Sequence, residues 1–131
     1  RLFQKNLSQE MVDGYLIESF VINDIARTLK NRNIPFYVVY IPVLVEVNTR
    51  LQNKMVNANG LSEDAFDFNQ LKTKIESFAK DADAPFIDLS NAFSKETEIL
   101  YLPTDGHFTI YGNEIAAKII VEALRNSFIK K

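Results

Sequence analysis

The 131-residue chain contains no cysteine and only one histidine, His107. The absence of cysteine excludes thiol catalysis, disulfide bonds and cysteine-ligated zinc, and it is compatible with any redox compartment. A single histidine excludes a histidine-rich metal site within one chain. The hydrophobic residues form no run near the roughly 18 residues of a membrane-spanning helix. Basic residues are not in excess, because the net charge is −2, which argues against a nucleic-acid partner.

The remaining composition is that of a globular protein. Hydrophobic residues make up 47% of the chain and charged residues 24%. A chain of this length buries about two-thirds of its unfolded surface, which is enough for a core. We therefore expect residues 1–131 to belong to a single domain and to form a core of their own.

The hydrophobic periodicity predicts helices and strands in alternation. The first helix has a wide apolar stripe, which predicts that it is well buried. The last helix is predicted to bury a stripe that ends at Phe128. The expected elements are a helix over 8–33 capped by Ser8, a strand over 34–42, a helix over 45–56 closed by Asn59-Gly60, a helix after a Ser62 cap with Phe68 on its inner face, a strand over 84–90, and a helix from 109 or 110 to 128.

This order of elements indicates a parallel sheet with helices on both faces. Two strands are too few for such a sheet. We therefore expect other strands to complete it, supplied either by a missing N-terminal segment or by self-association of the chain.

The sequence "TDGHFT" places Asp105 two residues before His107, at the start of the last helix. Histidine suits general-base catalysis because its ordinary pKa lies close to neutral pH. A neighbouring carboxylate can fix the imidazole tautomer and stabilise its charged form. Gly106 allows a tight loop that brings the two side chains together. The alternative is structural: "LPTDG" is also a good turn sequence, in which His107 is an ordinary surface residue.

Three stretches in order resemble the SGNH (GDSL-type) hydrolase superfamily. "LYLPTDGHFTIYGNEIAAKII" resembles its last conserved block, "IPFYVVYIP" its penultimate core strand, and "APFIDLSNAF" the strand before the last block. The resemblance implies a three-layer, flavodoxin-like α/β fold with a parallel sheet, of which only the C-terminal part is present. It implies that His107 is the general base and that Asp105 orients it. No metal or organic cofactor is implied.

The short Asp-x-His spacing resembles the branch of cell-envelope O-acetyltransferases and related esterases. This implies an ester substrate, such as an acylated carbohydrate, and a bacterial cell-envelope or extracytoplasmic location.

The superfamily's nucleophilic serine, in a Gly-Asp-Ser motif, has no counterpart in this chain, nor do its oxyanion-hole glycine and asparagine. We therefore expect the chain alone to be inactive, because these groups supply most of the rate. A non-catalytic SGNH-like binding or interaction domain is the alternative. The serines present, none in a nucleophile motif, are Ser8, Ser19, Ser62, Ser77, Ser90, Ser94 and Ser127.

Other polar and aromatic residues have two interpretations each. Asp88 ends a strand, where α/β ligand sites form, and it is equally suited to capping the next helix. Asp81 and Asp83 are too few for a calcium loop, which favours a solvated loop. Tyr101 and Phe108 flank the Asp–His loop and either line a pocket or pack onto the last helix.

Overall fold

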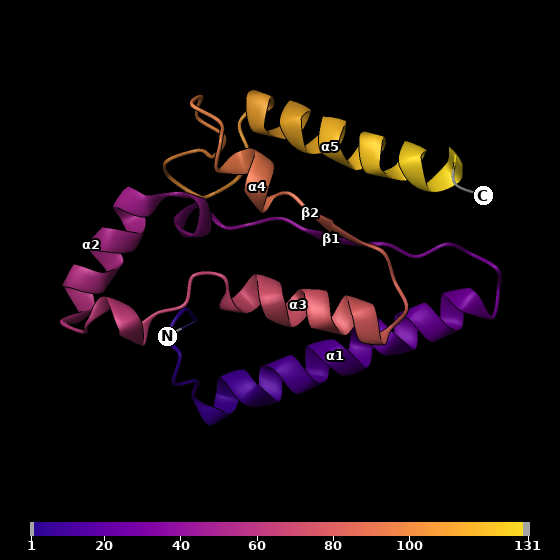
Figure 1. The fold of residues 1–131 in the computed structure, drawn as a ribbon, viewed down its shortest axis with the longest axis horizontal. Helices are drawn as coiled ribbons and strands as arrows, with labels where there is room; N and C mark the ends of the chain where they lie inside the picture. Colours follow the sequence, from indigo (N-terminus) through magenta and orange to yellow (C-terminus); the bar gives the residue numbers. More distant parts are fainter. Residues whose placement is uncertain (1, 130–131) are drawn as a thin grey trace.

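A computed structural model describes residues 2–129, the last two by their backbone alone. The chain alternates helices with two short strands, in the order predicted from the sequence (Figure 1). Its α-helices and strands are α1 (Gln9–Lys30), β1 (Val38–Tyr40), α2 (Thr49–Asn59), α3 (Gln70–Asp81), β2 (Phe86–Asp88), α4 (Ser90–Phe93) and α5 (Ile110–Ile129), with 3₁₀ turns η1 (Leu44–Val47) and η2 (Glu63–Ala65).

Helix ends with strong local signals lie where the sequence places them. Ser8 caps α1, its hydroxyl accepting a hydrogen bond from the Met11 amide at 3.4 Å. Gly60 ends α2 in the left-handed conformation, with φ 65°. Thr109 precedes α5, and its hydroxyl accepts a bond from the Gly112 amide at 3.0 Å. Phe128, predicted to end the buried stripe of α5, lies outside the residues whose side chains are described.

Two predicted helix starts are wrong. The helix expected over 45–56 begins as η1 and restarts at Thr49, because the Asn48 side chain caps the Leu51 amide at 3.0 Å. The helix expected after Ser62 is only the turn η2, and the Ser62 side chain makes no capping bond there. Phe68 therefore lies before α3, where it packs against Phe3 with ring centroids 5.5 Å apart.

The two strands pair in parallel, as predicted, with Val38 opposite Phe86 and Tyr40 opposite Asp88. Both are three residues long, shorter than the predicted strands over 34–42 and 84–90. Helix α5 lies on one side of the strand pair and α3 on the other, with α1 packed beyond α3 (Figure 1). This is a helix-rich α/β arrangement.

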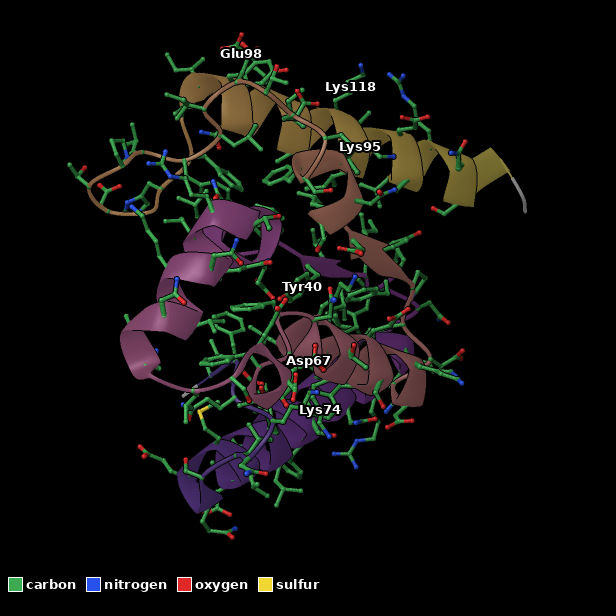
Figure 2. The ribbon with its side chains drawn as sticks, turned by 60° about the vertical axis from the view of Figure 1, so that its left-hand side comes forward. Tyr40, Asp67, Lys74, Lys95, Glu98 and Lys118 are labelled. Atoms are coloured by element: carbon green, nitrogen blue, oxygen red, sulfur yellow. The ribbon has the colours of Figure 1, made fainter. Side chains whose placement is uncertain are left out.

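The main core lies between the strand pair, α4 and α5. Alternate strand residues face opposite sides: Val39 and Ile87 pack with α5, whereas Tyr40 points to the side of α3, inside the molecule (Figure 2). The buried residues of this cluster are Ile87, Leu89, Phe93, Leu100, Tyr101 and Ala116.

Helix α1 is not well buried, contrary to the prediction from its apolar stripe. Tyr15 and Ala26 are buried, and α1 packs along α3. Its outer face is apolar and exposed: Leu16 is 65% exposed and Phe20 71%. The stripe is wider than one packing surface, so a single neighbouring helix covers only part of it. Val12, Ile17, Val21 and Ile25 are also exposed.

Hydropathy gives no candidate for a membrane span among the described helices, each of which is too short or too polar.

Candidate functional site

The Asp–His loop lies beside the end of β1. The chain leaves β1 at Tyr40 and turns at Pro42, which is fully buried. Tyr101, at the base of the Asp–His loop, donates a hydrogen bond from its hydroxyl to the Pro42 carbonyl. In α/β proteins, ligands bind outside the carboxyl ends of parallel strands. The loop is therefore at the edge of the sheet where an α/β site is expected.

Backbone hydrogen bonds close residues 102–107 into a short hairpin-like loop. Tyr101 and Phe108 form an antiparallel bridge at its base. Within it the Leu102 amide donates to the His107 carbonyl at 2.7 Å, and the Gly106 amide donates to the Leu102 carbonyl at 3.3 Å. Gly106 has φ 74°, in the region that glycine adopts without strain. The loop thus needs Gly106 for the reason that the sequence suggests.

The structure brings Asp105 and His107 together. The Asp105 Oδ1 atom accepts a hydrogen bond from the His107 backbone amide at 3.0 Å. The Oδ2 atom lies 3.2 Å from Nδ1 of the imidazole. One carboxylate therefore fixes both the loop backbone and the ring. This contact leaves Nε2 as the ring nitrogen available to another group.

These contacts lower the pKa of Asp105 below its ordinary value of 3.8. The main cause is the hydrogen bond from the His107 backbone amide, and the bond from the imidazole adds to it. A lowered pKa means that the contacts favour the ionised carboxyl group. Their contribution to stability is present above the ordinary pKa and is lost as the pH falls through the lowered value.

The pair is open to solvent and borders a hollow. The side chain of His107 is 81% exposed and that of Asp105 51%. A charge interaction between such exposed groups is strongly screened, so the pair alone does not form a water-excluded active site. The adjoining groove has a volume of about 420 Å³ and is lined by residues 41–44, Tyr101 and residues 105–108. None of these residues is a serine.

The other acidic candidates lie outside the groove. Asp88 accepts a hydrogen bond from the Ser90 amide at 2.8 Å at the start of α4, and its second oxygen lies 3.6 Å from Lys72. Asp81 and Asp83 are both exposed. Within residues 2–129, no group of three or more acidic or histidine side chains is arranged to hold a metal ion.

The opposite wall of the groove was not assigned from the sequence. Residues 41–44, which include the end of the predicted strand over 34–42, line the groove together with the Asp–His loop. Pro42, at the end of the predicted strand, was the sequence signal that could have indicated this wall. Glu46 was missed entirely: its carboxylate accepts bonds from the Val43 amide at 2.7 Å and from the Tyr40 hydroxyl.

Residues 18–131 match the family model described as SGNH hydrolase-like domain, acetyltransferase AlgX. The chain belongs to this family. No curated protein and no solved structure gives a significant match. Membership confirms the superfamily that the three sequence stretches resemble, and it supports an activity of the esterase or acetyltransferase kind. The match begins inside α1 and includes every later helix and strand.

Proposed function

We propose that this chain supplies the acid–base pair of an SGNH-type acyl-transfer site, with His107 as general base and Asp105 as its orienting carboxylate. The observation that carries the proposal is the pairing of Nδ1 with Asp105 Oδ2 at 3.2 Å, beside a groove at the end of β1. Family membership supports the chemical class.

In this proposal, Nε2 of His107 removes the proton from a serine hydroxyl as the serine oxygen attacks an ester carbonyl. Asp105 stabilises the imidazolium that forms. The imidazolium then returns the proton to the leaving alcohol as the carbon–oxygen bond breaks, which leaves an acyl-serine. Water completes a hydrolase cycle, whereas an acceptor hydroxyl completes a transferase cycle. Neither cycle uses a metal or an organic cofactor.

The acyl group that we propose is acetyl, following the description of the family, and the substrate is an acetyl ester such as an acetylated carbohydrate. The serine and the oxyanion-hole donors come from residues outside this chain, because no serine lines the groove. The segment that carries the serine, or a second copy of the chain, completes the sheet into the three-layer fold. The segment that carries the serine also covers His107, which strengthens the polar contacts by excluding water.

A non-catalytic SGNH-like domain is the second candidate, favoured by the absence of serine from the groove. Labelling with a serine-reactive fluorophosphonate separates the two. In the protein as its gene encodes it, we expect one labelled serine outside residues 1–131, found by peptide mass spectrometry. Absence of any label would favour the binding domain. A label on one of the seven serines of this chain would overturn the proposed origin of the nucleophile.

A further inference from the structure

Tyr101 connects the Asp–His loop to a distant part of the chain. Its side chain is 4% exposed, and its hydroxyl donates to the carbonyl of the fully buried Pro42, 59 residues away in sequence. This hydrogen bond joins the two walls of the groove, because Pro42 belongs to one wall and the loop that begins after Tyr101 forms the other.

The ring of Tyr101 is itself fixed by aromatic packing. Its centroid lies 6.0 Å from that of Phe93 and 5.2 Å from that of Phe108. Phe93 also contacts Phe108, with centroids 5.4 Å apart. Edge-on and tilted contacts of this kind favour one ring orientation. The hydroxyl of Tyr101 is thereby held in a single direction, toward Pro42.

The segment around the Pro42 carbonyl, which accepts this hydrogen bond, is also held in place. Glu46 binds the Val43 amide and the Tyr40 hydroxyl, on either side of Pro42 in sequence. Burial and the charge of Glu46 raise the pKa of Tyr101 well above its ordinary value of 10.0. Its hydroxyl is therefore protonated, and is a hydrogen-bond donor, at neutral pH.

The loop beyond Tyr101 has backbone hydrogen bonds of its own, but no buried side chain holds it against the groove. Every side chain from residue 102 to residue 107 is exposed. The position of the loop relative to the groove is therefore set at its base. We propose that Tyr101 is a positioning residue that holds the Asp105–His107 pair against the groove, an inference that rests on the function proposed above.

The test is Tyr101→Phe, which keeps the aromatic contacts and removes only the hydroxyl. We expect the loop to loosen at its base, where the Leu102 amide donates to the His107 carbonyl at 2.7 Å and the Thr109 amide to the Leu100 carbonyl at 2.9 Å. These two amides should exchange their hydrogens roughly 10-fold faster than in the wild type, as expected when one hydrogen bond that holds a segment is lost. Amide hydrogen exchange followed by NMR measures this in the present chain. In the nucleophile-containing protein, we expect kcat to fall roughly 10- to 100-fold with KM little changed, as for a misplaced catalytic group.

Tyr37→Phe is the matched control. It removes a tyrosine hydroxyl that contacts the Ser127 hydroxyl at 2.7 Å, away from the groove. It should leave the hydrogen exchange of the Leu102 and Thr109 amides and kcat unchanged. If Tyr101→Phe does not fold, Glu46→Gln replaces it, and should speed the exchange of the same two amides by less.

The outcomes separate this inference from the proposed function. A folded Tyr101→Phe or Glu46→Gln variant in which the Leu102 and Thr109 amides exchange as in the wild type overturns the positioning role, whatever the activity. Faster exchange of these amides in a protein that shows no acyl transfer supports the positioning role and counts against the proposed function.

Discussion

In the protein that carries the nucleophile, His107→Ala is expected to lower kcat for p-nitrophenyl acetate at least about 10³-fold. Without the imidazole, the serine hydroxyl has no group to accept its proton, and the leaving alcohol has no group to return it. The loss should fall on kcat rather than KM, because the ring acts during bond making and breaking. Stopped-flow or steady-state release of p-nitrophenolate gives both constants.

Two further variants sharpen this result. Asp105→Asn should lower kcat by about a hundredfold or more, since an amide neither fixes the same tautomer nor stabilises the imidazolium. Thr104→Ala changes an exposed residue of the same loop that does not line the groove, and should have near wild-type turnover. Unchanged turnover in His107→Ala would remove the assigned base and with it the proposed mechanism.

Gly112→Ala is expected to lower the free energy of unfolding by about 3 kcal/mol, the upper part of the range for overpacking. A methyl group at this position would lie 2.2 Å from the Leu100 carbonyl oxygen, far inside contact distance. The same carbonyl accepts the Thr109 amide at 2.9 Å, so it cannot move without loosening the start of α5. Thermal unfolding should show a fall in Tm of roughly 10 °C.

Gly14→Ala is the matched control for this substitution. Gly14 lies inside α1, and an added methyl group there meets no atom within 4 Å. Alanine favours the helix over glycine by about 0.5–1 kcal/mol, so this variant should be more stable than the wild type. Equal effects of the two substitutions would show that α5 does not approach Leu100 as closely as described.

The parts of the fold that depend on neighbouring residues could be predicted from the sequence. Ser8 caps α1 through a residue three positions away, and Gly60 ends α2 through its own backbone. The Asp105–His107 contact is likewise local, since the residues are two positions apart and Gly106 supplies the turn. Short-range geometry is sufficient to predict each of these.

The features that were missed depend on tertiary contacts. The bond from Tyr101 to Pro42 spans 59 residues, and nothing near either residue indicates its partner. The burial of α1 was overestimated, because a hydrophobic stripe shows which face of a helix can be buried but does not show whether another element packs against that face. Phe20 remains 71% exposed. Ser62 has the residue type of a cap, but its side chain makes no capping bond.

The tautomer of His107, read from ¹⁵N–¹H correlations across its imidazole, tests directly whether Asp105 orients the ring as a general base. The assignment is unambiguous because the chain has one histidine. In the neutral ring, we expect a proton on Nδ1, directed at Asp105, with Nε2 free to accept a proton, and we expect Asp105→Asn to abolish this preference. A ring protonated on Nε2, or one insensitive to Asp105→Asn, would show that Asp105 does not orient the imidazole for general-base catalysis.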